Sequence, residues 1–432
     1  MSANPTSSPF AVTIGWDWAD KKHDLSVRPT GATKSEASQL AQTPEAIHEW
    51  VAKARARFQG QTVAIAIETS RGPAISALVA YDFIVIYPIN PKALASYRAA
   101  FSVANAKGDP SDAHLLEEYI RLHHDRLKAL RPDTVLTRTL AGLVEARRHL
   151  VDERTRFVEQ LHSLLKTYYP LAEDLWSDEL TLPIATDFLD RWPDLESLQK
   201  ATPEVLRSFF FKHNSRSKTM IEERLQAIAQ AKPLTQDSAL IQPARLRVKA
   251  LTGMLKPLHR AVTQLDEEIE KAMDQHPDAP IFRSLPGAGP CLAPRLLVAF
   301  GTQRDRFQSA TEVAQFYGIA PVTRQSGTTK TVHFRHRCPK FGRQSFHENA
   351  GCALREPWAK CFHSHYKGKH DHRHHQANRA LAFKLIRIYY ACWKNHQPYD
   401  PNRYLKALEK NGSVIHQRLQ AQAQTTPKTS GE

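Results

Sequence analysis

Cysteine is scarce in this sequence. Five cysteines occur among 432 residues, and none belongs to a C-x-x-C pair. Because the number is odd and zinc-site spacing is missing, the sequence predicts neither a disulfide framework nor a structural zinc site. A chain of this kind suits a reducing compartment.

Long hydrophobic runs are also missing. Nowhere does the sequence hold the roughly eighteen consecutive apolar residues that a membrane-spanning helix needs. The first ten residues, MSANPTSSPF, lack the charged segment and apolar core of a secretory signal. We therefore expect a soluble cytoplasmic protein without a membrane partner.

Negative charge is in short supply. Asp and Glu number 44 against 59 Lys and Arg, which gives a formal net charge of +15. This surplus favours a polyanionic partner, because Lys and Arg that neutralise phosphates dominate affinity for nucleic acids. A basic soluble protein that binds no nucleic acid is the less favoured alternative on charge alone.

The hydrophobic residues, 41% of the chain, form different patterns along its length. Residues 8–133 alternate strand-like and helix-like segments, and residues 134–278 are helical throughout. Residues 279–408 combine apolar helices with a basic, loop-rich stretch, and residues 409–432 form a polar tail expected to be partly disordered. The sequence thus predicts several domains, as its length also does.

The first part predicts a sheet covered by helices. Strand-like runs of apolar and β-branched residues occupy 10–18, 62–69 and 82–90, and residues 23–29 follow the first run as a hairpin partner. Helical segments lie between and after these runs. This alternation is the pattern of an α/β domain.

The second part predicts an arm of long helices. Residues 138–169 carry Leu, Val and Phe at three- and four-residue spacing, with charges between them. The segment is long for a globular helix, so a coiled-coil-like arm is expected. Helical patterns continue at 203–231 and 246–276, and proline-containing stretches at 181–194 and 232–243 are expected to be joints.

Acidic residues stand where the predicted sheet would hold a ligand. Asp17 closes the first strand and Glu68 closes the third. The carboxyl ends of strands are where α/β sheets bind ligands, and an unpaired buried carboxylate is costly. Asp109 and Asp112 precede an apolar helix. Four acids of this kind can hold two Mg²⁺ ions for phosphodiester chemistry.

Asp109 and Asp112 also fit an ordinary helix start. Asp109 would be the N-cap, Pro110 the first helical residue, and Asp112 an acid in the first turn. The two interpretations are compatible, because a capped helix can point both carboxylates toward the strand ends. A hairpin, a strand bearing Glu and a helix bearing Asp, in that order, are typical of a ribonuclease-H-like nuclease.

A glycine-rich turn separates two apolar segments of the third part. Residues 286–289 are Pro-Gly-Ala-Gly. In a helix-hairpin-helix, Gly287 and Gly289 would let the backbone approach a phosphate at the start of the next helix. An ordinary helix connection is the alternative.

Ser326 and Gly327 lie in a predicted turn before a basic, strand-like stretch. A serine can attack a phosphodiester where cations stabilise the charge that develops on the phosphate, although most loop serines only form turns. The basic residues interpreted as phosphate-binding are Arg324, Lys330, Arg335, Arg337, Lys340 and Arg343.

In this order the motifs resemble those of the DEDD transposases of bacterial insertion sequences, a family of bridge-RNA-guided recombinases. The N-terminal part is similar to their RuvC-like domain in IGWDWADKKHDLSV, IAIETS and AKGDPSDAHLL. The C-terminal part is similar to their transposase domain in LPGAGPCLAPRLLVAFG, VTRQSG, RQSFHENAG and RALAFKLIRIYYACWKNHQPYD.

The resemblance implies a RuvC-like α/β domain at 8–133 and a mostly α-helical transposase domain at 279–408. It implies Mg²⁺, or Mn²⁺ in its place, as the cofactor, and Ser326 as a nucleophile that links covalently to DNA. It also implies donor and target DNA, a structured bridge RNA and further copies of the chain (a dimer or tetramer) as partners, acting at the nucleoid. The family's acidic tetrad falls on Asp17, Glu68, Asp109 and Asp112.

Two other functions fit parts of the sequence. A RuvC-like nuclease, such as a junction resolvase, would need the four acids but not Ser326. A non-catalytic DNA-binding protein would need the helix-hairpin-helix but neither the acids nor Mg²⁺.

Overall fold

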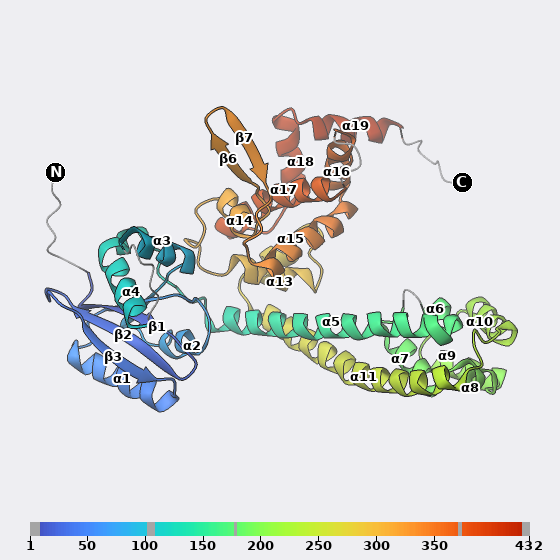
Figure 1. Ribbon diagram of the computed structural model, residues 1–432. Helices are drawn as coiled ribbons and strands as arrows, with labels where there is room; N and C mark the ends of the chain where they lie inside the picture. Colours follow the sequence, from blue (N-terminus) through green and yellow to red (C-terminus); the bar gives the residue numbers. More distant parts are fainter. Residues whose placement is uncertain (1–8, 102–108, 177–178, 370–373, 426–432) are drawn as a thin grey trace. The chain divides into compact units, whose positions relative to one another are not determined.

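The computed structural model describes residues 9–101, 109–176, 179–369 and 374–425, without the side chains of residues 101, 109–111, 369 and 422–425. The chain divides into two compact units, Met1–Pro132 (the N-terminal unit) and Asp133–Glu432 (the C-terminal unit). Figure 1 labels most of the helices and strands of both. None of the helices in the described ranges combines the length and the apolar composition needed to cross a bilayer.

The N-terminal unit is built on a mixed five-stranded sheet (Figure 1). The strands are β1 (Val12–Asp17), β2 (Lys22–Pro29), β3 (Glu36–Ala41), β4 (Val63–Ile67) and β5 (Ile84–Pro88). Their order is β3-β2-β1-β4-β5, with β1–β2 and β2–β3 antiparallel and β1–β4 and β4–β5 parallel. This confirms the expected α/β architecture, and β3 adds a strand that the sequence did not predict.

Helices cover both faces of the sheet. The helical elements are α1 (Pro44–Arg57), α2 (Pro73–Leu78), α3 (Pro91–Phe101), α4 (Asp109–His123) and the 3-10 turn η1 (His124–Arg126). On one face, Ile14 and Ile65 pack in a core with Ile47 of α1. On the other face, Ala64 packs in a core with Leu116 of α4. Alternate residues of each strand therefore face different helices.

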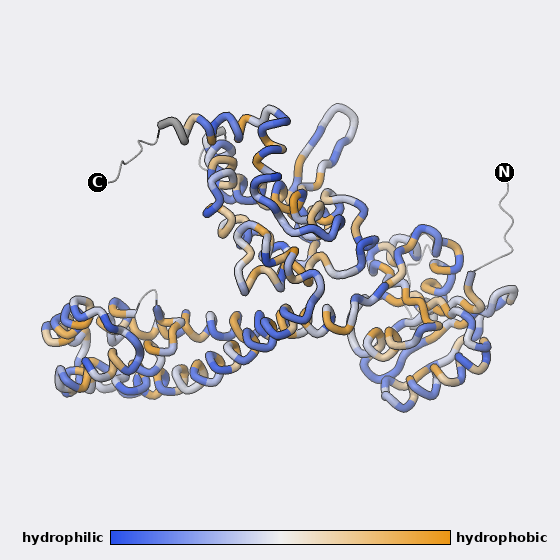
Figure 2. The backbone as a smooth tube through the Cα atoms, turned by 180° about the vertical axis from the view of Figure 1, so that it is seen from behind, coloured by the Kyte–Doolittle hydropathy of each residue, from blue (hydrophilic) through white to orange (hydrophobic). Residues whose placement is uncertain are grey.

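Two long antiparallel helices form an arm in the C-terminal unit. They are α5 (Val135–Tyr168) and α11 (Ser238–Gln275). Arg147 pairs with Asp266, and Arg247 donates to Gln160 at 3.5 Å further out, which sets the register. Figure 2 shows hydrophilic and hydrophobic stretches alternating along both helices. The arm carries α6 (Pro170–Trp176), α7 (Pro183–Arg191), α8 (Leu195–Gln199), α9 (Pro203–Lys212) and α10 (Lys218–Gln230).

Helix α11 begins inside the stretch 232–243, which the sequence predicts to be a joint. The Asp237 side chain caps it by accepting a 2.9 Å hydrogen bond from the Ala239 N–H. Pro243 and Pro257 lie inside the helix, where each lacks a backbone donor. Burial of residues such as Val248 on the apolar face offsets this loss, so proline does not end the helix here.

The rest of the C-terminal unit packs around one apolar core that includes Phe300, Phe346 and Trp393. Its helical elements are α12 (Ala279–Arg283), α13 (Leu292–Phe300), α14 (Ala310–Phe316), α15 (Lys340–Cys352), η2 (Ala353–Arg355), α16 (Pro357–Lys369), α17 (His374–Lys394), α18 (Pro401–Lys410) and α19 (Val414–Thr425). β6 (Val322–Ser326) and β7 (Thr329–His333) form an antiparallel hairpin. Helix α19 lies in the predicted tail, yet its Ile415 belongs to the core.

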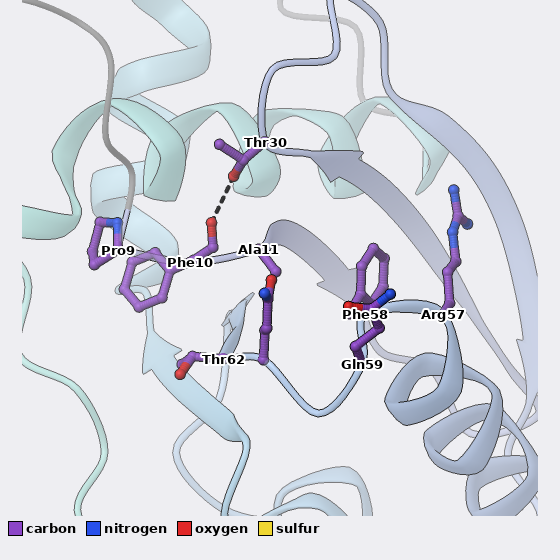
Figure 3. Close-up of a pocket in the computed structure, with 9 residues that line it drawn as sticks. Pro9, Phe10, Ala11, Thr30, Arg57, Phe58, Gln59 and Thr62 are labelled. Atoms are coloured by element: carbon purple, nitrogen blue, oxygen red, sulfur yellow. Dashed lines mark hydrogen bonds between the residues drawn. The ribbon is translucent and has the colours of Figure 1, made fainter.

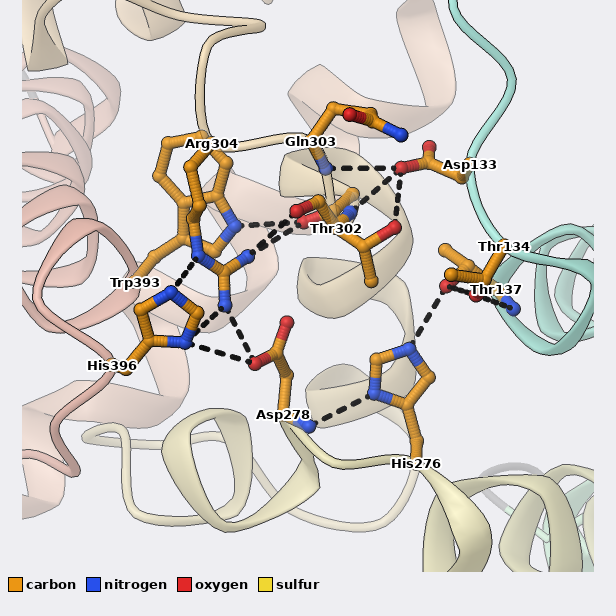
Figure 4. Close-up of polar contacts among 11 residues, drawn as sticks. Asp133, Thr134, Thr137, His276, Asp278, Thr302, Gln303, Arg304, Trp393 and His396 are labelled. Atoms are coloured by element: carbon orange, nitrogen blue, oxygen red, sulfur yellow. Dashed lines mark hydrogen bonds and ion pairs between the residues drawn. The ribbon is translucent and has the colours of Figure 1, made fainter.

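A network of polar contacts joins the base of the arm, where α5 begins and α11 ends, to this core (Figure 4). Asp133, just before α5, accepts a 2.7 Å hydrogen bond from the backbone N–H of Thr302. Arg304 donates to Asp278, beyond the end of α11, at 2.6 Å and lies 4.9 Å from the Trp393 ring centroid. The loop after α13 is thus bound to both ends of the arm.

Replacing Arg304 with Ala is expected to lower the free energy of unfolding by about 3–5 kcal/mol, because it leaves the buried carboxylate of Asp278 without its cationic partner. Asp278 is 5% exposed. Urea denaturation followed by tryptophan fluorescence measures the loss. Arg156→Ala is the matched control, since its pair with Glu153 joins two solvent-exposed side chains of one helix and should matter by less than about 1 kcal/mol. Equal losses in both variants would contradict this account of the network.

Candidate functional site

Asp17 and Glu68 lie side by side at the carboxyl edge of the sheet. β1 and β4 are parallel, with Trp16 opposite Ile67. Asp17 is the last residue of β1, and Glu68 follows the last residue of β4. Because the register is in step, the two half-buried acids occupy equivalent places on neighbouring strands.

Strand alternation places both acids on the face covered by α4. Thr13 shares this face with Asp17, and its hydroxyl donates to Glu117 of α4 at 2.9 Å. Ala66 shares the face with Glu68 and packs in the same core as Leu116 of α4. Residues two apart on a strand point to the same side, so Asp17 and Glu68 face α4 as well.

Helix α4 crosses β1 at Gly15. A Cβ atom at this position would lie 1.8 Å from the carbonyl oxygen of Ala113 and 2.5 Å from the backbone nitrogen of Glu117. Thr13, earlier in β1, contacts Glu117, later in α4, so the helix runs opposite to the strand. The beginning of α4, with Asp109 and Asp112, therefore lies toward the strand end that bears Asp17.

Asp112 is buried and forms an ion pair with Arg98 of α3. The cation offsets a carboxylate that would otherwise face the strand-end acids unscreened. Helix α4 begins at Asp109, close to the predicted start, but the Asp109 side chain lies outside the described residues. Among the side chains that are described, no three His, Cys, Asp or Glu groups cluster closely enough to hold a metal ion.

Glu117, a buried acid of α4 on the same face of the sheet, was missed by sequence reasoning. Its side chain is fully buried, and it pairs with Arg28 of β2 at 3.0 Å besides accepting from Thr13. The signal was a Glu at a core-facing position, one after Leu116 and four after Ala113, in an otherwise apolar stripe. Glu117 clamps α4 to β1 and β2 about one turn beyond Asp112.

A hollow opens at the opposite end of β1, away from the acids (Figure 3). Phe10, Thr30 and Thr62 line it, and its one charged lining residue is Arg57, which pairs with Glu36 at 2.7 Å. The length of β1, about 16 Å over the five residue steps from Val12 to Asp17, separates this hollow from Asp17. It is therefore no part of the acidic edge.

Ser326 ends β6, where the sequence predicts a turn. It pairs with Thr329 across the hairpin, and Gly327 takes a left-handed φ of 55° between them. Ser326 and all of β7 are exposed. A two-stranded hairpin by itself is only marginally stable in water. The hairpin thus presents a serine hydroxyl to solvent.

The predicted phosphate-binding residues divide into two groups. Arg335 and Arg343 are half-buried at the foot of the hairpin, where an Arg343 N–H donates to the Arg335 carbonyl at 3.4 Å. The four exposed residues are Arg324, Lys330, Arg337 and Lys340.

The glycine-rich turn connects α12 and α13, and its two glycines differ. A Cβ on Gly287 would lie 2.5 Å from the backbone nitrogen of Ala353, so this glycine serves close packing within the chain. Gly289 has open space around its Cα, which leaves room for a ligand. Buried Asn349 and Tyr389 both donate to the Pro286 carbonyl at 3.0 Å and hold the turn in place.

Comparison with known families matches both ends of the chain. Residues 14–170 match the family model of the DEDD transposases of IS110, and residues 279–367 match that of the transposase IS116/IS110/IS902 family. Together the two matches cover more than half of the sequence and contain the acidic edge and the Ser326 hairpin. The chain belongs to the DEDD transposases of insertion sequences.

Relatives of this transposase span nearly its whole length. A Streptomyces coelicolor protein named for the mini-circle transposase of IS117 is 29% identical, over 92% of this chain and 98% of its own. An uncharacterised 42 kDa protein of insertion element IS900 from Mycobacterium paratuberculosis is 26% identical, over 90% of this chain and 97% of its own. The enzymatic activity is accordingly that of a DNA transposase.

DEDD transposases typically depend on a divalent metal ion. Carboxylate oxygens are the donors that hard divalent cations prefer, but in the described structure Asp17, Glu68 and Asp112 do not lie close enough together to hold one, and Asp112 is paired with Arg98. Their elements converge at one edge of the sheet.

Proposed function

We propose that this transposase cuts and rejoins DNA through Ser326, assisted by Mg²⁺ held at the acidic edge. Asp17 and Glu68 at neighbouring strand ends, facing the helix that begins at Asp109, carry this proposal. The tetrad of the family resemblance consists of these three residues and Asp112. The sheet and α4 would then form a RuvC-like, ribonuclease-H-like domain.

In the proposed reaction the Ser326 oxygen attacks a DNA phosphorus. The new serine–phosphate bond forms as the phosphodiester bond to one deoxyribose oxygen breaks; the serine proton leaves to a base, and the released oxygen takes up a proton. Attack by a hydroxyl of another strand reverses these steps and rejoins the DNA. Bound Mg²⁺ would supply charge stabilisation at the phosphoryl oxygens.

We further propose that a structured bridge RNA pairs with donor and target DNA, and that copies of the chain assemble as a dimer or tetramer. The formal charge of +15 supports binding of several nucleic-acid strands. Sequence recognition would then reside in base pairing, and the protein would contact backbone and shape. The helix-hairpin-helix would contribute a backbone contact at Gly289, the glycine with open space around it.

Ser326→Ala tests the nucleophile. We expect the denaturant-resistant protein–DNA adduct to disappear and strand exchange to fall by roughly three orders of magnitude or more, because the attacking group is gone. DNA affinity should be unchanged. Thr328→Ala, which removes another exposed hydroxyl from the same turn, is the control and should keep the adduct. Cleavage by Ser326→Ala at the normal rate would instead support a RuvC-like nuclease that uses the acids alone.

A further inference from the structure

The foot of the Ser326 hairpin is held between two arginines. Phe334 directly follows β7. The Arg379 guanidinium of α17 lies 4.1 Å from the centroid of its ring, and that of Arg343 of α15 lies 4.9 Å from it. The Asn378 side chain joins the two helices here by donating to the His347 carbonyl at 3.0 Å.

No described carboxylate balances the charge of this cluster. Arg335, Arg343 and Arg379 are half-buried, and none forms an ion pair within the described part of the chain. Other half-buried arginines of the same unit do have such partners: Arg304 pairs with Asp278 at 2.6 Å, and Arg295 pairs with Glu348 at 2.5 Å. The Nε atoms of Arg335 and Arg379 are buried and have no hydrogen-bond partner among the described residues.

The positive potential here also affects the neighbouring histidine. Burial, followed by the charges of Arg379, Arg343 and His375, lowers the pKa of His347 to about 4. Burial and the charge of Arg343 likewise lower the pKa of Arg379. Packing like charges together is costly, and a bound anion offsets the cost.

We propose that Arg343 and Arg379, placed around Phe334, bind a backbone phosphate of the DNA strand that Ser326 attacks. A planar guanidinium matches the geometry of a phosphodiester. Phe334 lies five residue steps along the chain from Thr329, the partner of Ser326, which is about 16 Å of strand. Along a B-form duplex this distance corresponds to about five base pairs. The arginines therefore anchor the substrate beside the cleavage point and leave the reacting phosphate to Ser326.

The salt dependence of DNA binding tests whether these arginines bind a phosphate. The assignment of that phosphate to the strand attacked by Ser326 rests on the proposed function. Each phosphate contact contributes about 0.9 to the slope of log affinity against log salt. The double variant Arg343→Gln, Arg379→Gln should lose about that much slope and bind a labelled DNA duplex roughly tenfold more weakly at 0.1 M salt. The control Arg355→Gln, Arg387→Gln removes two exposed arginines of the same unit. Identical slopes in the two double variants would overturn the proposal.

A parallel titration with a labelled hairpin RNA separates the two sources of phosphate. Loss of affinity for the duplex supports the anchor proposed here. Loss confined to the RNA would overturn its assignment to the attacked DNA strand.

A second measurement leaves both arginines in place. The charged groups that face His347 are Arg343 on its own helix and Arg379 and His375 from α17. A phosphate bound among them should raise the pKa of His347 from about 4 toward the ordinary value of about 6.5. NMR titration of [13C]histidine-labelled protein with and without the DNA duplex measures this, with His347→Gln identifying the resonance. A pKa that stays at about 4 in the saturated complex would overturn the proposal.

The outcomes separate this site from the serine mechanism. Ser326→Ala should bind DNA with the full salt slope but form no adduct. The arginine double variant should still form some adduct at saturating DNA. Wild-type protein that shows the arginine-dependent slope yet never forms an adduct would overturn the serine mechanism and leave the phosphate site standing.

Discussion

Replacing Asp17 with Asn should reduce strand cleavage by about three orders of magnitude and leave the fold intact. Asp17 lies beside Glu68 on the face toward α4. Asparagine would offer Mg²⁺ a neutral amide oxygen as a ligand where the proposed site needs a negatively charged carboxylate. Loss of metal-based charge stabilisation of about 4 kcal/mol corresponds to roughly this factor in rate. A cleavage assay on labelled DNA, with Mg²⁺ varied, measures it.

A readout independent of activity accompanies this variant. Mg²⁺ should raise the melting temperature of the wild-type protein, because a ligand that binds only the folded state stabilises it. Asp17→Asn should lose most of this increase. The control is Asp20→Asn, an exposed acid three residues away, which should keep both cleavage and the Mg²⁺ response. Normal cleavage by Asp17→Asn would show that the acidic edge is not the catalytic centre.

Gly15→Val is expected to displace α4 and destabilise the N-terminal unit by about 3 kcal/mol or more. The added Cβ would lie 1.8 Å from the Ala113 carbonyl oxygen and 2.5 Å from the Glu117 nitrogen. Both are backbone atoms, which cannot rotate away as a side chain can. Urea denaturation and limited proteolysis within α4 measure the effect, and cleavage should be lost as well, because Asp112 moves with the helix.

Gly142→Ala is the matched control for that variant. Gly142 lies inside α5 with open space around its Cα, so alanine should stabilise the helix by up to about 1 kcal/mol. Opposite signs for the two substitutions would assign the effect to the crossing of α4 and β1. A Gly15→Val protein as stable as the wild type would contradict the crossing.

The sequence predicts those parts of this fold whose residue patterns are local. β1 and β4 carry mostly apolar residues, β1 ends at Asp17 and Glu68 directly follows β4, so both the strands and the position of these two acids could be anticipated. β3 could not, because its EASQLA sequence is polar and has weak strand propensity. It is a strand because it pairs with β2 in antiparallel register.

The contacts of the acids depend on tertiary structure and were not predicted. Arg98 and Asp112 are fourteen residues apart, and their ion pair exists only because α3 and α4 pack on the same face of the sheet. Glu117 and Thr13 are 104 residues apart, and neither residue alone indicates the other. The prolines of residues 232–243 also predicted a joint between helices. In the structure α11 begins within this stretch and continues through Pro243, because the residues that follow are buried on its apolar face.

The two ends of the arm meet at one place. The side chains of Thr137, in the first turn of α5, and His276, just after α11, are hydrogen-bonded at 2.9 Å. The chain segment between these two residues therefore departs from the C-terminal core and rejoins it at one place. The arm is in this sense an insertion that the remaining C-terminal unit does not need for its connectivity. Removing matching whole turns from α5 and α11 should therefore shorten the arm without disturbing the place where its two ends meet. The hairpin that bears Ser326 and its arginine foot would keep their geometry through such a change.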